Sequence, residues 1–266
     1  MDKIAVITGA SRGIGYALAL ELAAKNISVV AIARSEEDLT NLKHQFPDRI
    51  NIIVADLSAA AGRFKAIQEI LRLGNIQYLI HNAGIITPIA PLQALSEEDI
   101  RQILETNLLS PILFTKQLLP SMNRESRILN VSSVAAHQSI PGLGSYCISK
   151  AGINMWTNIL RQELQENNIF VTSVIPGEVD TPMQQNLRDA SFDYFPLVNE
   201  FNEAYRHDAL IPATICASFL AWLLLDTTEE HFLEQEWNIY DESHHQYWLR
   251  QKLPLPLNKQ KISIVD

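Results

Sequence analysis

A tyrosine and a lysine in the middle of the chain have the spacing of a proton-transfer pair. Tyr146 and Lys150 are four residues apart in 145–166, a stretch whose pattern predicts a helix, so their side chains should share one face. A free phenol, with a pKa of about 10, exchanges its proton poorly near neutral pH. A neighbouring ammonium favours the phenolate and should move the pKa of Tyr146 toward the working range. Such a phenol could give a proton to a substrate oxygen or take one from it.

Two other polar side chains could serve the same chemistry. Ser133 follows 127–131, an apolar run that predicts a strand, and precedes Tyr146 by thirteen residues. Its hydroxyl could donate to a substrate oxygen and share the negative charge that builds there. Asn107 lies in a region expected to be helical from 97 to about 122, with Pro111 restarting the helix midway. Reduction of a carbonyl would further require a hydride donor.

A glycine-rich segment near the start of the chain is typical of dinucleotide binding. Thr8-Gly9-Ala10-Ser11-Arg12-Gly13-Ile14-Gly15 stands between a predicted strand, 4–8, and a predicted helix, 14–25. Glycines permit the tight turn, the approach of backbone N–H groups to a pyrophosphate, and close packing of helix on strand. A strand-to-helix turn often carries glycine for other reasons, but the flanking elements favour binding. The residues expected at the cofactor are Gly9, Ser11, Arg12, Gly13, Ile14 and Gly15.

In this order and spacing, the motifs resemble the short-chain dehydrogenase/reductase family over nearly the whole chain, up to about residue 240. The chain looks most like the carbonyl-reductase members, similar to sepiapterin and benzil reductases. The resemblance implies that Tyr146 is the general acid in reduction and the general base in oxidation. It implies that Lys150 also binds the nicotinamide ribose and that Ser133 binds the substrate oxygen. Asn107 would hold a water that continues a proton relay from Lys150.

The resemblance also implies further contacts with the cofactor. The carboxylate of Asp56 would accept from the adenine amino group, while Leu57 would pack on the ring. Asn82-Ala83-Gly84, after the predicted strand 76–81, would lie along the cofactor. The segment after the predicted strand 169–175 would approach the nicotinamide carboxamide through Pro176, Gly177, Val179 and Thr181.

The end of the second predicted strand, 27–33, indicates which nicotinamide cofactor is used. An acid at this point favours the free ribose hydroxyl of NAD, whereas arginine favours the 2′-phosphate of NADP. Ala33 occupies the position, and Arg34 follows it with a planar donor fork for phosphate. Arg12 could supply a second cation. Both could instead be solvated surface arginines, but their two positions favour NADP(H).

The substrate is expected to be a small apolar or aromatic ketone or dicarbonyl. The segment 178–210 has no clean period, carries five Phe and Tyr residues, and would be a substrate-loop insertion. These aromatic side chains could equally serve the internal packing of a lid. His137 is either a polar group of the pocket or a solvent-facing loop histidine. The residues expected at the substrate are Ser133, Ala135, His137, Tyr146, Glu178 and Met183.

The elements that must position these residues alternate between short apolar strands and longer helices. This alternation predicts an α/β fold, a Rossmann-like doubly wound parallel sheet of about seven strands with helices on both faces. No linker interrupts the pattern, which indicates a single domain over 1–266. The expected strands are 4–8, 27–33, 51–55, 76–81, 127–131, 169–175 and 236–240.

Composition excludes several other classes of protein. The formal net charge is −9, without a basic run, so neither nucleic acid nor a membrane is an expected partner. Cys147 and Cys216 are the only cysteines, too few for a disulfide framework, and no spacing suggests a metal site. These features favour a cytoplasmic protein without a metal, and the resemblance implies an enzyme that acts on a small carbonyl or alcohol.

The C-terminal part departs from the pattern of the family that the chain resembles. Many members end the seventh strand with a Gly-Gly pair that forms a tetramer contact, whereas this chain continues irregularly after Asp241. A homo-oligomer, dimer or tetramer, is expected. A 3-oxoacyl-carrier-protein reductase and a catalytically silent NADP(H)-binding sensor stay open as alternatives.

Overall fold

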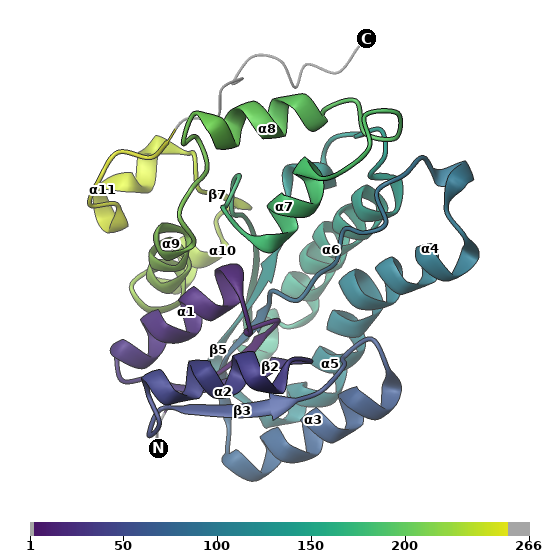
Figure 1. Ribbon diagram of the computed structural model, residues 1–266. Coiled ribbons are helices and arrows are strands. Elements are labelled where there is room, and N and C mark those ends of the chain that lie inside the picture. Colours follow the sequence, from purple (N-terminus) through teal and green to yellow (C-terminus); the bar gives the residue numbers. More distant parts are fainter. Residues whose placement is uncertain (1–2, 255–266) are drawn as a thin grey trace.

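The computed structural model describes residues 3–254 and places a seven-stranded sheet at the centre of the molecule (Figure 1). The strand order is β3-β2-β1-β4-β5-β6-β7, and every neighbouring pair is parallel. The predicted Rossmann-like fold is confirmed. The strands are β1 (Ile4–Thr8), β2 (Ser28–Ala33), β3 (Ile50–Val54), β4 (Ile76–His81), β5 (Met122–Val131), β6 (Phe170–Ile175) and β7 (Trp237–Asn238).

Helices cover both faces of this sheet. The helices are α1 (Gly13–Ala24), α2 (Glu36–Gln45), α3 (Ala60–Leu73), α4 (Glu97–Leu104), α5 (Ser110–Leu118), α6 (Gly144–Glu163), α7 (Pro182–Arg188), α8 (Val198–Arg206), α9 (Ala213–Leu225), α10 (Glu229–Leu233) and α11 (His245–Trp248). None of these described helices is long and apolar enough to cross a membrane.

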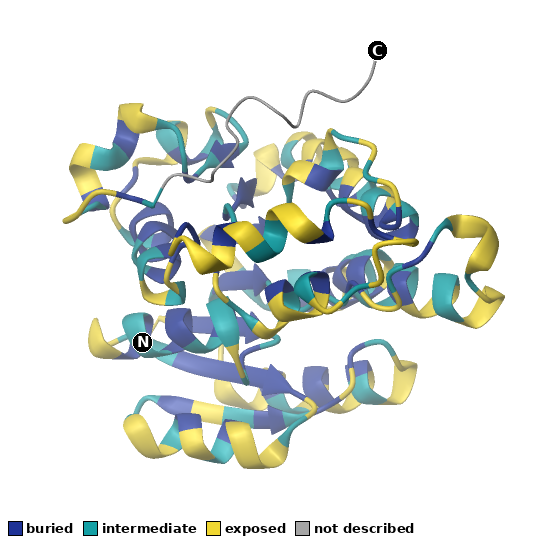
Figure 2. Cartoon of the chain, turned by 45° about the horizontal axis from the view of Figure 1, so that its top comes forward, coloured by how far each residue is buried: buried dark blue, intermediate teal, exposed yellow. Residues whose placement is uncertain are grey.

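Alternation along each strand divides the buried residues into two cores. In β1, Ala5 and Ile7 join the core formed with α1, α2, α9 and α10. Ile4 and Val6 join the opposite core, formed with α3, α5 and α6. Most strand residues are accordingly buried, while the outer faces of the helices are exposed (Figure 2).

Helix starts follow local capping chemistry. The hydroxyl of Ser35 accepts from the backbone N–H of Asp38 at the start of α2. Ser96 and Asp99 form a reciprocal capping box at the start of α4. Three acidic residues occupy the first turn of α2 and three occupy that of α4, where the helix dipole favours negative charge.

Five regions differ from the sequence-based expectation. The region 97–122 is not one restarted helix, because a π-helical turn, Glu105–Leu109, joins α4 to α5. Strand β5 begins at Met122, and β7 has two residues because only Val174 and Ile175 of β6 pair with it. The segment 178–210 contains α7 and α8. The chain after Asp241 forms a helical turn and α11; residues 255–266 lie outside the described part.

Candidate active site

A cleft of about 950 Å³ opens where the parallel strands end at their carboxyl edge. Its walls include residues at or just after the ends of β1, β2, β4, β5 and β6, together with α7 and α8. Ligands bind at this edge in open α/β sheets because the loops after neighbouring strands diverge there. Figure 1 shows α7 and α8 lying over this edge of the sheet.

Most residues expected at the cofactor or substrate line this one cleft. Three do not: Gly15 and Asn107 are packed behind the walls, and His137 lies outside. The expected residues in the walls are Gly9, Ser11, Arg12, Gly13, Ile14, Arg34, Asp56, Leu57, Asn82, Ala83, Gly84, Ser133, Ala135, Tyr146, Lys150, Pro176, Gly177, Glu178, Val179, Thr181 and Met183.

The turn between β1 and α1 depends on its glycines. Gly9 and Gly13 have φ angles of 68° and 57°, in the left-handed region that glycine adopts without strain. A Cβ on Gly9 would lie 2.8 Å from Cα of Ala83, and one on Gly15 would lie 2.5 Å from Nδ2 of Asn82. Gly15 therefore serves close packing, while the other two shape the wall.

Thr8 and Asn82 fix this turn against the strand next to β1. The amide of Asn82 donates to the carbonyl oxygens of Thr8 and Gly9, at 2.9 and 3.1 Å. The hydroxyl of Thr8 accepts from the backbone N–H groups of Asn82 and Ala83, both at 3.0 Å. The segment after β4 thus holds the glycine turn from behind.

Tyr146 and Lys150 lie on one face of α6, and both are buried, with exposed fractions of 7% and 6%. The lysine Nζ lies 5.5 Å from the centre of the tyrosine ring. It donates to the carbonyl oxygen of Val131 at 2.7 Å, so the end of β5 holds the ammonium in place. The two side chains are therefore neighbours inside the cleft, as their spacing predicts.

Burial controls the ionisation of this pair. It raises the pKa of Tyr146 to about 12, while a hydrogen bond with Ser133 acts in the opposite direction. Burial also lowers the pKa of Lys150 to about 8. This direction is opposite to the one expected from the charge of the lysine, because desolvation of the buried phenol is the largest cause of the shift.

Ser133 stands at the start of the 3₁₀ turn Val134–Ala136 that follows β5. Its hydroxyl oxygen accepts from the backbone N–H of Ala135 at 3.2 Å and is within hydrogen-bonding reach of Tyr146. On the other side of the phenol, the hydroxyl of Tyr146 lies 4.0 Å from Sδ of Met183, in α7. Two hydroxyls and a thioether thus meet at one point of the cleft.

Asn107 occupies the π-helical turn and has a different geometry from the one expected. Its Oδ1 accepts from the backbone N–H of Ile85 at 2.8 Å. Its Nδ2 donates to the carbonyl oxygen of Ile85 at 2.8 Å and to Ser149 at 3.2 Å. Because both amide hydrogens are used, the side chain fixes Ile85 in the cleft wall, and the water relay stays a prediction.

The substrate end of the cleft differs from the expected aromatic wall. Of the aromatic residues in 178–210, only Phe201 lines the cleft. Phe195 is fully buried in the hydrophobic cluster that also contains Tyr146, while Phe192, Tyr194 and Tyr205 are exposed. Packing of the lid, the alternative interpretation, therefore accounts for Phe195, while the three exposed side chains serve neither role.

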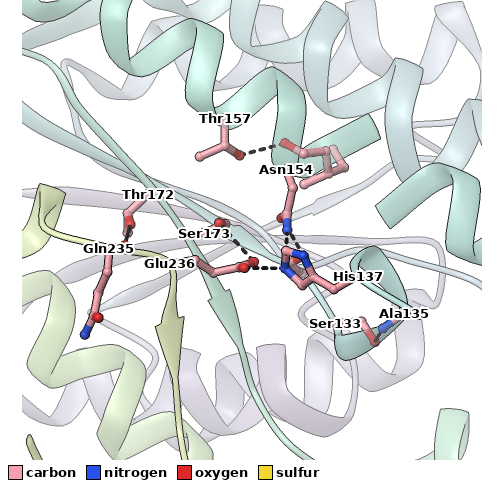
Figure 3. Close-up of polar contacts among 11 residues, drawn as sticks. Ser133, Ala135, His137, Asn154, Thr157, Thr172, Ser173, Gln235 and Glu236 are labelled. Atoms are coloured by element: carbon pink, nitrogen blue, oxygen red, sulfur yellow. Dashed lines mark hydrogen bonds and ion pairs between the residues drawn. The ribbon is translucent and has the colours of Figure 1, made fainter. Parts of the chain in front are cut away.

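His137 is the second correction at this end. Its Nε2 lies 2.5 Å from a carboxylate oxygen of Glu236 and 3.0 Å from Nδ2 of Asn154 (Figure 3), and the residue does not line the cleft. No local pattern around His137 indicates this partner, because Glu236 comes 99 residues later.

Sequence reasoning missed several residues of the cleft. Tyr240, just after β7, lines it and accepts from the backbone N–H of Glu178 at 3.2 Å. Glu200 and Glu203 reach it from α8, and Asp38 lies in the wall beside Arg34. No spacing signal marked Tyr240, Glu200 or Glu203, because their neighbours in the cleft come from distant segments.

A parallel sheet, a glycine turn into its first helix, and a buried tyrosine and lysine at the same edge define a dinucleotide-binding class of protein. The sequence model of the family described as short chain dehydrogenase matches residues 3–191. The chain therefore belongs to the short-chain dehydrogenase/reductase family, whose members are oxidoreductases that use a nicotinamide cofactor, NAD or NADP. The predicted family is confirmed.

Individual relatives extend this comparison. The chain is 32% identical over 239 residues to the benzil reductase ((S)-benzoin forming) of Bacillus subtilis, covering 85% of this chain and 95% of that protein. It is 35% identical over 191 residues to retinol dehydrogenase 16 of Homo sapiens, covering 70% of this chain and 60% of that protein's length. A solved short-chain dehydrogenase/reductase of Saccharomyces cerevisiae superposes with a TM-score of 0.84 at 25% identity, covering 92% of this chain and 99% of that one.

Proposed function

We propose that this protein transfers hydride from NADPH to the carbonyl of a small apolar or aromatic ketone or dicarbonyl. The observation that carries the proposal is the meeting of Ser133, Tyr146 and Lys150 in one cleft with the glycine turn. When bound, NADPH supplies the hydride. The side chains of the cleft supply the proton and hold the reacting groups in position.

The residues have separate roles in this reaction. Tyr146, whose raised pKa keeps the phenol protonated, donates to the developing alkoxide as the general acid. The hydroxyl of Ser133 donates to the same oxygen and shares its charge. The ammonium of Lys150 stabilises the phenolate that remains and binds the ribose of the nicotinamide.

The preference for NADPH rests on two cations at the adenosine end of the cleft. Arg12 and Arg34 both line it, and a 2′-phosphate accepts well from a guanidinium. Asp38 lies in the same wall, and its carboxylate would act against a phosphate. The substrate preference rests on apolar walls near Tyr146: Ile86, Ile140, Leu143, Met183, Leu187, Leu197 and Phe201.

The protein is also proposed to be a homo-oligomer of the cytoplasm. Ile148, Met155 and Ile159 form an exposed apolar stripe on α6, which association of two copies would cover. Cys147 and Cys216 are free, as a reducing compartment requires. Light scattering of the purified chain gives the oligomeric state directly.

A panel of ketones, diketones and quinones, run with NADPH and with NADH, tests the function most directly. We expect loss of NADPH absorbance with apolar dicarbonyls such as benzil. Binding of NADPH without turnover of any carbonyl would favour the silent sensor. Turnover of acyl thioesters alone would favour the 3-oxoacyl-carrier-protein reductase.

A substitution of Arg34 tests the proposed preference for NADPH. Arg34→Asp should raise the Kd for NADPH by about tenfold, since a charge-assisted phosphate contact becomes repulsive, and should leave that for NADH within about twofold. Arg101→Asp is the control, because Arg101 pairs with Glu97 on the surface. Equal effects of Arg34→Asp on both cofactors would reject NADPH as the preferred one.

A further inference from the structure

The short edge strand β7 is bonded to two different loops of the cleft. Glu236 directly precedes the strand and contacts His137, in the loop that begins with Ser133. Tyr240 follows the strand and bonds to Glu178, in the turn after β6. Both loops contribute to the cleft, yet neither is close in sequence to β7.

The first connection is a chain of polar contacts behind the catalytic loop (Figure 3). The hydroxyl of Ser132 donates to Oδ1 of Asn154 at 2.7 Å, and Nδ2 of Asn154 lies 3.0 Å from Nε2 of His137. His137 contacts Oε2 of Glu236 at 2.5 Å, and Oε1 of Glu236 accepts from Ser173 at 3.2 Å. Both ends of the Ser133 loop are thereby joined to the edge of the sheet.

The second connection holds the turn after β6. The hydroxyl of Tyr240 accepts from the backbone N–H of Glu178 at 3.2 Å. Gly177, with φ of 78°, lets the ring pack against the turn, since a Cβ there would lie 2.9 Å from Cε2 of Tyr240. The carbonyl oxygen of Glu178 accepts from the N–H of Ile211 at 2.7 Å, so the turn is held from two sides.

The strand between these two residues is itself anchored in the core. Trp237 is buried and donates to the carbonyl oxygen of Phe232 at 3.2 Å. The rings of His244 and His245 bond to the carbonyl oxygens of Asn238 and Ile239, at 3.0 and 2.7 Å. A rigid support of this kind can fix side chains that orient a site.

We propose that Glu236 and Tyr240 are positioning residues, which fix the Ser133 loop through His137 and the nicotinamide-side turn through the Glu178 N–H, respectively. The inference rests on the proposed function for the identity of the two loops. It predicts separate kinetic effects, because the Ser133 loop acts in proton transfer and the turn after β6 acts in cofactor binding.

Measurement of kcat in variants tests the contact between Glu236 and His137. Glu236→Ala and His137→Ala should each lower kcat for benzil reduction by about tenfold, while the KM for NADPH stays within about twofold. The double variant should lose no more than either single one, since both remove the same contact. Glu236→Gln keeps an acceptor for His137 and a partner for Ser173, so it should restore kcat.

The Tyr240 connection is tested by binding. Tyr240→Phe removes only the hydroxyl and should raise the Kd for NADPH, measured by fluorescence titration, by about fivefold with kcat nearly unchanged. His44→Ala, an exposed histidine on α2, is the control for substitution as such and should change neither quantity.

The outcomes separate this inference from the function on which it rests. Equal losses of kcat and NADPH affinity in the Glu236 and Tyr240 variants, or no loss in either, would overturn the inference. If Glu236→Gln failed to restore kcat, the proposed role of the contact between Glu236 and His137 would be overturned. If the wild-type chain binds NADPH but reduces no carbonyl, the proposed function fails, and the Tyr240 titration still decides the second connection.

Discussion

At the scale of single residues, the centre of the cleft holds two ionisable groups, and burial shifts the pKa of each in the direction that favours its neutral form. The phenol of Tyr146, with a pKa of about 12, stays protonated at any physiological pH. The ammonium of Lys150, with a pKa of about 8, is near its point of proton loss. The lysine is therefore the group whose charge changes within the working range.

This difference predicts the pH dependence of reduction. A depressed lysine pKa means that the charge is present below about pH 8 and is lost as the pH rises through that value. The proposed role of Lys150 needs the charge. The kcat with NADPH should therefore be constant below pH 7 and should decrease above about pH 8, approaching a tenfold loss for each pH unit. A pH–rate profile checks this expectation. A kcat that stayed constant to pH 9.5 would contradict the role.

Residue types and spacings were informative where the chemistry is local. The pairing of Tyr146 with Lys150 follows from a four-residue interval on one helix. The pKa of the phenol could not be predicted this way, because it depends on burial by segments from the whole fold. His137 was ambiguous for the same reason, since its partner Glu236 comes from the far end of the chain.

At the scale of elements, the turn between β1 and α1 is the part most completely encoded in sequence. Its glycines are needed at defined φ angles and at close approaches to Asn82 and Ala83. Elements with capping signals, such as α2 and α4, begin where Ser35 and Ser96 predict. The π-helical turn Glu105–Leu109 had no such signal, because it arises within a continuous helical pattern.

The turn offers a direct test of backbone geometry. Gly9→Ala should reduce NADPH affinity by at least about tenfold, because φ is 68° and the new Cβ would lie 2.8 Å from Cα of Ala83. Gly74→Ala is the matched control. Gly74 also has a positive φ, 131°, but its nearest contact is a side-chain carbon at 3.4 Å, and it lies outside the cleft.

The control should lose stability and keep NADPH affinity, as measured by thermal unfolding and fluorescence titration. If both variants bound NADPH equally well, the turn would not be the phosphate-binding element.

At the scale of the whole molecule, the chain after Asp241 closes the core against α9. Trp248 donates to Nδ1 of His244 at 2.8 Å, and its ring lies 4.9 Å from that of Phe219. His244 also stacks on Phe219, with ring centres 5.1 Å apart. The sequence suggested an irregular tail because these contacts join residues far apart in the chain.

Removal of this anchor should destabilise the fold. Trp248→Ala should cost about 3 kcal/mol or more, the usual range for deleting a large buried aromatic side chain, and lower Tm by several degrees. Tyr247→Ala, at an exposed neighbour, should cost much less. Equal unfolding midpoints for the two variants would show that the segment does not stabilise the core.

The architecture of the molecule was predictable because alternating apolar strands and helices leave few topologies. The walls of the cleft were not, since only Phe201 of the five aromatic residues in 178–210 lines the cleft, while the others are buried or exposed elsewhere. Composition of a segment shows which side chains it carries, while packing decides which way they point.

Transfer of deuterium from NADPH labelled at C4 to benzil is the measurement closest to the proposed chemistry. Wild-type protein should form benzoin with one deuterium on the alcohol carbon. Tyr146→Phe should retain NADPH affinity within about twofold and form this product at least about 100-fold more slowly, because the general acid is gone. Labelled benzoin formed by Tyr146→Phe at the wild-type rate would contradict the account.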